Sequence, residues 1–362
     1  MSRVPDDARF ATKAVHAGLD PDPSYGGIVP AIHQASTYVQ PEPGEFVEDY
    51  DYSRAANPTR TQLEKALGQL EGGHGTAWAS GMAATHALLT AHCKAGDHVV
   101  LPDDLYGGTY RLVDKILVHW GLRYTMVDQA DLDATERAIT DETTLIWVET
   151  PTNPTLKTAD IAAIAQMKRN AIVAVDNTFA TPVNQRPLEL GADASVHSTT
   201  KYLGGHSDVV GGAVVTNDEK LHEKLRFVQL SIGAVPGPLD CFLVHRGLRT
   251  LHLRMQAAET NAKAIVALLR EQGVDTVLYP GFGAMVSFRH PDAVGIAGRT
   301  TIFSLAESLG GVESLIEVPQ AMTHQSVEGS AAAVPPDLVR VSCGVEAAED
   351  LVEDLRRAMA TS

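Results

Sequence analysis

The chain has 362 residues, of which 44% are hydrophobic and 20% charged, with a formal net charge of -16 at pH 7. Nucleic-acid binding depends on clustered Lys and Arg, so this acidic balance argues against a nucleic-acid partner. No apolar run approaches the roughly 18 residues of a membrane span, and the polar start MSRVPDDARF has no signal-peptide core. We therefore expect no membrane association.

The cysteines and histidines do not form a metal-binding pattern. Cys93, Cys241 and Cys343 lie far apart without a CxxC spacing, and the 14 histidines show no ligand spacing on a common helix face. The sequence therefore predicts neither a disulfide framework nor a metal site. A reducing, cytoplasmic compartment fits this cysteine usage best.

The first fifty residues contain little periodic pattern but many prolines and glycines, as in PDPSYGG and QPEPGEF. This composition predicts an extended arm over residues 1–50, of the kind that reaches a neighbouring subunit. A helix follows, begun by Pro58 and ended by Gly72, with leucines on one face.

Helical and strand-like stretches then alternate as far as about residue 216. Nearly continuous Val, Ile and Leu runs indicate strands buried on both faces, and alternation with helices predicts a mainly parallel sheet in a three-layer α/β domain. The helical stretches are 82–94, 108–119, 131–139 and 159–169, and the strand-like runs are 98–102, 144–150, 171–178, 194–198 and 211–216.

The pattern changes after about Val228. A long amphipathic stretch, CFLVHRGLRTLHLRMQAAETNAKAIVALLREQ, precedes short strand candidates in DTVLYP, AMVSFRH, TTIFSLA and LVRVSCG and a closing acidic helix. Less apolar strands interleaved with helices are typical of a smaller α+β domain. We expect a large domain over residues 51–245 and a C-terminal domain over residues 246–362.

Several common catalytic motifs are absent from the sequence. G-x-G-x-x-G, the phosphate loop ending in Gly-Lys, H-E-x-x-H and G-x-S-x-G do not occur. A nicotinamide enzyme, a nucleotide hydrolase, a zinc protease and a serine hydrolase therefore lose their main sequence support.

Lys201 lies between hydroxyl side chains and a glycine turn in HSTTKYLGGHSDVVGG. A partly desolvated amine with a lowered pKa can attack a carbonyl and form a Schiff base, which would make this lysine catalytic. The alternative is an ordinary solvated lysine before a turn. Only partners elsewhere in the chain can decide between the two.

Two further segments offer such partners. SGMAA puts Gly81 at the start of a predicted helix, where free N–H groups and the helix dipole can bind phosphate. Asp176 ends a buried strand and could keep a ring nitrogen protonated, as a pyridinium electron sink requires. The alternatives are an ordinary glycine at a helix start and a helix-capping aspartate.

Tyr106 and Arg340 could complete such a site. Tyr106 in DDLYGG could lie flat against an aromatic cofactor, or could be a tyrosine at the core edge. Arg340 alternates with apolar residues in LVRVSCG, so it could point inward and grip a carboxylate with two N–H groups. An exposed strand arginine is the alternative.

From about Ala11 to the last predicted helix, the chain resembles the Cys/Met-metabolism enzymes that use pyridoxal 5'-phosphate (PLP). This group includes cystathionine γ-synthase, cystathionine γ-lyase, cystathionine β-lyase and methionine γ-lyase. The fold that the resemblance implies is α/β, the PLP-dependent transferase fold type I of aspartate aminotransferase. The segments that carry it are YSRAANPTR, ASGMAATHALL, PDDLYGGTYRL, WVETPTNP, VDNTFATP, HSTTKYLGGHSDVVGG, FSLAESLGGVESL, MTHQSV and LVRVSCG.

The resemblance also implies roles around the cofactor. Lys201 would bind PLP as a Schiff base and later move protons, Asp176 would pair with the pyridine nitrogen, and Tyr106 would stack on the ring. Its neighbourhood also makes Tyr106 a candidate acid or base at the leaving group. The implied phosphate contacts come from Gly81, Met82, Ser198, Thr200 and, in the adjacent subunit, Tyr52 and Arg54.

The implied substrate is a small amino acid. Arg340, with Asn153 and Ser308, would bind its α-carboxylate, and Glu307 occupies a position where γ-synthases and γ-lyases carry glutamate. The resemblance further implies a homo-oligomer, namely a dimer that shares its active sites and pairs into a homotetramer.

Within the family, we rank the cystathionine γ-synthase type first, in which cysteine replaces the γ-substituent of an O-acylhomoserine. The alternatives are cystathionine γ-lyase, which cleaves cystathionine to cysteine, 2-oxobutanoate and ammonia, and then methionine γ-lyase. A PLP-binding protein with little turnover is a hypothesis of a different class, against which Lys201, Tyr106 and Arg340 together argue. A structural oligomer without cofactor would be colourless even when PLP is supplied.

One stretch departs from the family pattern. Between Gly281 and Phe282 the family carries an insertion that this chain lacks, and residues 289–300 also look shortened. These losses fall in the predicted small domain. We therefore expect an intact cofactor site and altered substrate access.

Overall fold

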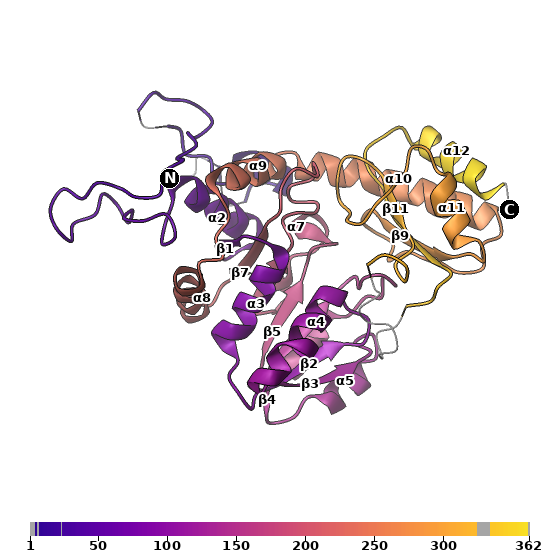
Figure 1. Ribbon diagram of the computed structural model, residues 1–362, viewed down its shortest axis with the longest axis horizontal. Coiled ribbons are helices and arrows are strands. Elements are labelled where there is room, and N and C mark those ends of the chain that lie inside the picture. The colour runs from indigo at the N-terminus through magenta and orange to yellow at the C-terminus, as the bar shows by residue number, and fades with distance from the viewer. Residues whose placement is uncertain (1–3, 6, 23, 324–333, 361–362) are drawn as a thin grey trace.

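The computed structural model describes residues 4–5, 7–22, 24–323 and 334–360, and every structural statement below concerns these residues. Most of the MTHQSV segment, from His324 onward, lies outside them. Two sheets organise the described chain, and Figure 1 shows the smaller sheet, with its helices, to the right of the larger one.

The larger sheet has seven strands in the order β1-β7-β6-β5-β4-β2-β3. Strands β3, β2, β4, β5 and β6 run parallel, whereas β7 is antiparallel to both β6 and β1. The predicted mainly parallel α/β sheet is thus confirmed. The bounds are β1 (His74–Trp78), β2 (His98–Pro102), β3 (Arg123–Val127), β4 (Thr143–Glu149), β5 (Ile172–Asp176), β6 (Ala194–His197) and β7 (Gly212–Thr216).

Strand β4 shows why the apolar runs are continuous. Leu145 and Trp147 point into one core cluster, while Ile146 and Val148 point into the cluster on the opposite face. Because successive side chains of a strand alternate between faces, a strand covered on both sides must be apolar at every position.

Helices cover both faces of this sheet. The cluster with Leu145 also contains residues of α3, α4 and α8, and the cluster with Ile146 contains residues of α6. The bounds are α2 (Pro58–Glu71), α3 (Gly81–His92), α4 (Gly107–Lys115), η1 (Leu117–Trp120), α5 (Leu132–Ala138), α6 (Ile161–Met167), α7 (Thr181–Asn184), η2 (Pro187–Leu190), α8 (Glu219–Ile232) and α9 (Pro238–Leu248).

The smaller sheet has five strands in the order β10-β11-β12-β9-β8, antiparallel except for the β10–β11 pair. With the helices α10, α11 and α12 it forms an α+β unit (Figure 1). The division of the chain at residue 245 remains a prediction, and α9 runs across this number. The bounds are β8 (Val277–Leu278), β9 (Met285–Arg289), β10 (Ser304–Leu305), β11 (Leu315–Glu317), β12 (Leu338–Ser342), α10 (Leu251–Glu271), α11 (Ala293–Arg299) and α12 (Ala348–Met359).

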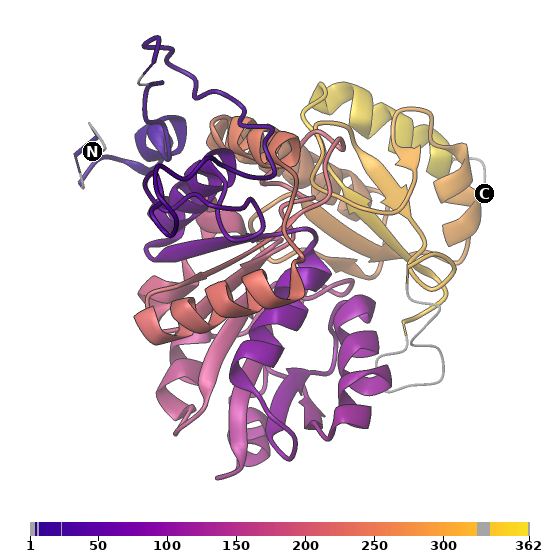
Figure 2. The ribbon, with the colours of Figure 1, turned by 60° about the vertical axis from the view of Figure 1, so that its left-hand side comes forward.

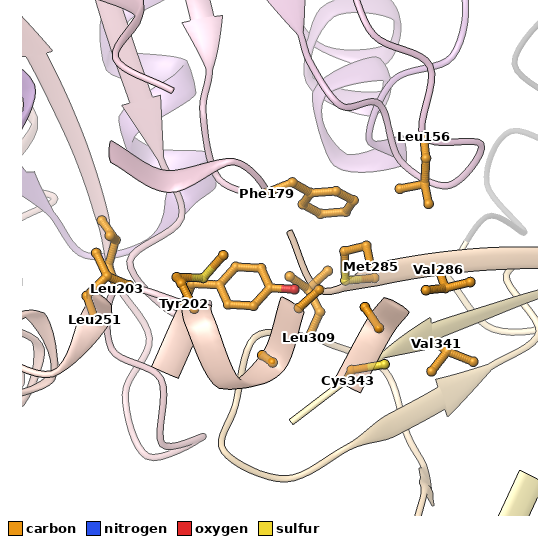
Figure 3. Packing of buried hydrophobic residues seen from close by; sticks show 14 of the residues in the cluster. Leu156, Phe179, Tyr202, Leu203, Leu251, Met285, Val286, Leu309, Val341 and Cys343 are labelled. Atoms are coloured by element: carbon orange, nitrogen blue, oxygen red, sulfur yellow. The ribbon is translucent and has the colours of Figure 1, made fainter. Parts of the chain in front are cut away.

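A single apolar cluster joins the two sheets. Figure 3 shows Phe179, which follows β5, lying over Leu309 and Met285 of the smaller unit, with Tyr202 beside them. Tyr202 directly follows Lys201, so the lysine is anchored to the contact between the two units.

The amino-terminal region is only partly extended. Helix α1 (Phe10–His16) buries Ala14 in the same cluster, which the composition did not predict. The following loops project from the body of the molecule (Figure 2), and Tyr25, Ile28 and Val39 on them are strongly exposed. In the described part of the chain, no helix is both long and apolar enough to cross a membrane.

Asp354 of α12 holds the loop that leads from α11 to β10. Its buried carboxylate accepts hydrogen bonds from the N–H groups of Thr301, Ile302 and Phe303, at 2.8 to 3.1 Å, and from the Thr301 hydroxyl at 2.7 Å. Burial alone would raise the pKa of Asp354, but these hydrogen bonds outweigh it and lower the pKa.

We expect Asp354→Asn to lower the free energy of unfolding by about 2 to 3 kcal/mol at neutral pH, because an amide cannot satisfy this set of donors. A lowered folded-state pKa means that the stabilisation exists above the unfolded-state value and is lost as pH falls through the folded-state value. The difference between variant and parent should therefore shrink in acid. Urea unfolding at several pH values measures it, and the exposed neighbour Glu353→Gln is the control; equal losses for both variants would contradict this assignment.

Candidate active site

A cavity of about 270 Å³ opens where β4, β5 and β6 end and α3 begins, and residues 307–309 and Arg340 of β12 close it. It brings together all of the predicted site residues except two. Tyr52 and Arg54 line a different cavity of this chain, beside Gly233 and Pro238. The predicted residues that line the main cavity are Gly81, Met82, Tyr106, Asn153, Asp176, Ser198, Thr200, Lys201, Glu307, Ser308 and Arg340.

Lys201 lies in the turn after β6, and its Nζ donates a 2.6 Å hydrogen bond to the Ser308 hydroxyl. Burial and, second, the positive charge of Arg340 lower its pKa to about 8, while the charges of Glu317 and Glu307 act in the opposite direction. Near neutral pH the uncharged amine is therefore more abundant than it is for a solvated lysine. The alternative of an ordinary solvated lysine does not fit this buried position.

Asp176 and Glu149 are neighbours at the ends of β5 and β4, paired in the sheet register. Burial raises the pKa of both carboxyl groups, and for Glu149 the nearby charge of Asp176 raises it further. Thr178 donates its N–H to Asp176 at 3.0 Å, and the charge of His197 also favours the ionised aspartate. A cation placed against Asp176 would stabilise its ionised form.

Glu149 also fixes two loops around the cavity. Its Oε2 accepts the N–H of Tyr106 and its Oε1 accepts the N–H of Asn153, each at 2.9 Å. The aromatic ring and the amide that line the cavity are thus positioned by one carboxyl group.

The first turn of α3 borders the cavity with Gly81 and Met82. The Ser80 hydroxyl caps the helix by accepting the Ala83 N–H at 3.0 Å, so the first N–H groups remain free for a ligand. A Cβ at Gly81 would lie 2.8 Å from the Cβ of Ser198, which explains why glycine is needed there. An anion at this helix start would meet N–H groups and the Ser198 hydroxyl.

The Thr200 hydroxyl is already engaged within the chain. It donates to the carbonyl oxygen of Gly211 at 3.2 Å and accepts the Gly211 N–H at 3.0 Å. To donate to a phosphate it must turn its proton away from Gly211. It can do so while still accepting the second bond.

Arg340 points into the cavity from β12 and is almost fully buried, so the exposed alternative is wrong. Its Nη1 donates to Asn153 Oδ1 and its Nη2 to the Ser308 carbonyl oxygen, each at 2.9 Å. Ser308 adopts a φ of 88°, which is strained for a residue other than glycine, and this backbone lets one residue serve both Lys201 and Arg340.

Tyr106 and Glu307 also line the cavity. Tyr106 is 38% exposed and lines the cavity, so it is accessible to a ligand. Burial raises the pKa of its hydroxyl, which the charge of Arg111 partly opposes.

The donor set fits PLP, the cofactor expected from the sequence. A buried amine of lowered pKa suits an aldehyde, a buried carboxylate suits a protonated ring nitrogen, and a helix start with a serine hydroxyl suits a phosphate. The Nε–H of Arg340 is buried and lacks an acceptor among the described residues, as expected for a group that meets a substrate carboxylate.

Sequence reasoning missed some residues of the site. It placed Glu149 at a strand end without a role, and it did not single out Thr178, Thr323 or Glu317. Glu317 lies on a three-residue strand, too short for any periodic pattern to reveal. Glu149 could have been found, because a carboxylate that ends a buried strand lies at the ligand-binding edge of a parallel sheet.

Known proteins are similar to this chain in both sequence and fold. A curated cystathionine γ-synthase of Mycobacterium tuberculosis is 52% identical, with 96% of each chain covered. A cystathionine β-lyase of Lactococcus lactis subsp. cremoris is 46% identical, covering 96% of this chain and 98% of the relative. The crystal structure of cystathionine γ-synthase from Xanthomonas oryzae pv. oryzae, in complex with cystathionine, has a TM-score of 0.95 and 39% identity, covering 99% and 98% of the two chains.

A family model described as Cys/Met metabolism PLP-dependent enzyme matches residues 11–360. This range includes every residue that lines the cavity and both sheets. The chain belongs to the Cys/Met metabolism family of PLP-dependent enzymes.

Proposed function

We propose that this enzyme is a cystathionine γ-synthase, which replaces the γ-substituent of an O-acylhomoserine by the thiol of cysteine and forms cystathionine. The observation that carries the proposal is the likeness to γ-synthases, at 52% identity over nearly the whole chain. Glu307 in the cavity lining supports it, because the resemblance associates glutamate at this position with cystathionine chemistry.

PLP, when bound, supplies an electron sink that stabilises negative charge on the substrate carbon next to the amine. Lys201 is the proposed base that removes the α-proton, because its lowered pKa makes the uncharged amine more accessible at moderate pH. Its 2.6 Å hydrogen bond to Ser308 holds the amine beside the carboxylate-binding side of the cavity.

Arg340 is the proposed anchor of the substrate α-carboxylate, with Asn153 and Ser308 holding the guanidinium. A bidentate contact between Arg and a carboxylate fixes the direction of the substrate as well as its position. Because Ser308 contacts both Arg340 and Lys201, a carboxylate held by Arg340 would place the α-carbon near the amine.

Tyr106 and Glu307 are proposed to act on the part of the substrate beyond the α-carbon. The tyrosine hydroxyl stays protonated at neutral pH, since burial raises its pKa, and can donate a proton to a leaving group. A carboxylate at Glu307 would attract an ammonium group such as that of cysteine.

We also propose that the active enzyme is a homo-oligomer in which Tyr52 and Arg54 reach the phosphate site of the adjacent subunit. Two observations support this: neither residue lines the Lys201 cavity of its own chain, and apolar residues of the amino-terminal loops are exposed. Exposed apolar side chains that cluster on one segment are typical of an interface. The stacked arginine and tyrosine, with the guanidinium 5.3 Å from the ring centroid, would enter as one unit.

A substrate panel tests the reaction. Purified enzyme given an O-acylhomoserine and cysteine should form cystathionine, and mass spectrometry of the products measures it. Cystathionine or methionine supplied alone should be cleaved slowly. Fast release of a 2-oxo acid from cystathionine, with no synthesis of cystathionine, would instead assign a lyase activity and refute the proposal.

Lys201 should carry the cofactor. Borohydride reduction followed by peptide mapping should find the label on the Lys201 peptide, and Lys201→Ala should reduce turnover by at least about a thousandfold, since base and cofactor attachment are both lost. The exposed Lys115→Ala is the matched control and should retain parental activity. A label on another lysine, or turnover near the parental rate in Lys201→Ala, would contradict the assignment.

Hybrid oligomers test the shared site. Lys201→Ala and Arg54→Ala should each be nearly inactive, yet subunits of the two mixed and reassembled should regain about a quarter of the parental activity, because each hybrid dimer then contains one intact site. Activity after mixing, compared with each variant reassembled alone, measures this. No recovery in proven hybrids would mean that Arg54 serves its own chain.

A further inference from the structure

Glu317 lies behind the carboxylate-binding arginine. It pairs directly with Arg340 across β11 and β12, so the two side chains project from the same face of the small sheet. Its Oε1 is 3.1 Å from Arg340 Nη1, and the two side chains are only 1% and 3% exposed. Glu317 is not part of the cavity lining, so it contacts Arg340 without reaching a bound substrate.

The hydrogen bonds of Arg340 leave one edge of the guanidinium for a ligand. The group has five N–H donors, and Nη1 serves Asn153 and Glu317 while Nη2 serves the Ser308 carbonyl oxygen. The Nε–H has no acceptor among the described residues. Nε–H and the second Nη2–H therefore form the free edge of the guanidinium. A substrate carboxylate can accept a hydrogen bond from each of these two groups.

Orientation alone does not require a charged partner. Asn153 and the Ser308 carbonyl already hold both terminal nitrogens with neutral acceptors. Glu317 adds a negative charge next to a buried cation, where electrostatic interactions are weakly screened. This charge opposes any carboxylate that approaches the far edge of the same guanidinium.

The guanidinium of Arg340, next to Glu317, offsets part of the effect of burial on this carboxyl group. Burial raises its pKa, which the charges of Arg340 and Lys201 and the hydroxyl of Thr323, a donor at 2.9 Å, oppose. Glu307 acts in the same direction as burial. Tyr202 and Tyr106 are the other titratable groups whose charge acts on Arg340.

We propose that Glu317 is a positioning residue that holds the Arg340 guanidinium and weakens its attraction for carboxylates, so that substrate and product exchange readily. The inference rests on the proposed role of Arg340. In this role, Glu317 sets the affinity for substrate from outside the cavity.

Glu317→Gln tests this, because the amide keeps an oxygen for Arg340 and Thr323 and removes only the charge. Propionate, which lacks an amine and cannot react, is the probe. Its dissociation constant on the holoenzyme, measured by calorimetry, should fall about tenfold when one opposing charge is removed. KM for the amino-acid substrate should fall as well, while kcat does not rise.

A second readout follows from Lys201. The charge of Glu317 raises the pKa of Lys201, so its loss should shift the pH titration of the cofactor's visible absorbance to lower pH. A purely structural role for Glu317 would change the midpoint of thermal unfolding without producing this shift.

Two further variants bracket the result. Glu317→Asp keeps the charge but withdraws it by one methylene, so propionate should bind with an affinity between those of the parent and Glu317→Gln. Glu349→Gln, on the exposed face of α12, is the matched control and should leave all constants unchanged.

Each outcome decides the matter. Parental or weaker propionate binding in folded Glu317→Gln would overturn the inference, and if that variant does not fold, the absence of tightening in Glu317→Asp would do so. A parent enzyme that does not bind propionate at all would instead refute the proposed role of Arg340 and, with it, this inference.

Discussion

The buried charge of Arg340 is the constraint on which the site depends. A guanidinium removed from water must be met by several acceptors, or its desolvation would destabilise the fold. Here the acceptors come from both units of the molecule: Asn153 from the loop after β4, and Ser308 and Glu317 from the smaller unit. The same interaction that satisfies the arginine therefore fixes the two sheets relative to each other at the cavity.

Lys201 depends on the same arrangement. Its amine loses water because the residues around Ser308 close over the turn after β6, and its pKa falls for that reason first and because of Arg340 second. The backbone of that closing loop approaches closely. Gly310 has a φ of 78°, and a Cβ there would lie 2.6 Å from the Tyr202 nitrogen. A larger residue at this position would push the loop away and return water to the amine.

The sequence predicts those parts of the fold that a local pattern determines. Strands buried on both faces appear as apolar runs, and the alternation around Arg340 correctly indicates an inward-pointing side chain. In contrast, β1 and β11 were missed, because HGTAW and LIE are stabilised by their partner strands rather than by their own composition. The long helical stretch is in fact two helices, α9 and α10, which separate at Arg249 and Thr250, just after Gly247.

The candidate site was predicted more completely than the fold, because the resemblance supplied positions that no periodicity reveals. Tyr52 and Arg54 show its limit, since the structure of a single chain places them in another cavity. Glu317 shows the opposite case. Its importance comes from its contact with Arg340, which neither the sequence pattern nor the resemblance predicted.

The carboxyl group of Glu149 has an evolutionary consequence. Its carboxylate accepts the main-chain N–H groups of both Tyr106 and Asn153. The positions of these two cavity-lining residues are therefore coupled. A change of specificity that required the backbone of Tyr106 to move would also disturb Asn153, and the reverse. Divergence within such a cavity is therefore easiest at side chains that Glu149 does not support, and Glu307 is one of them.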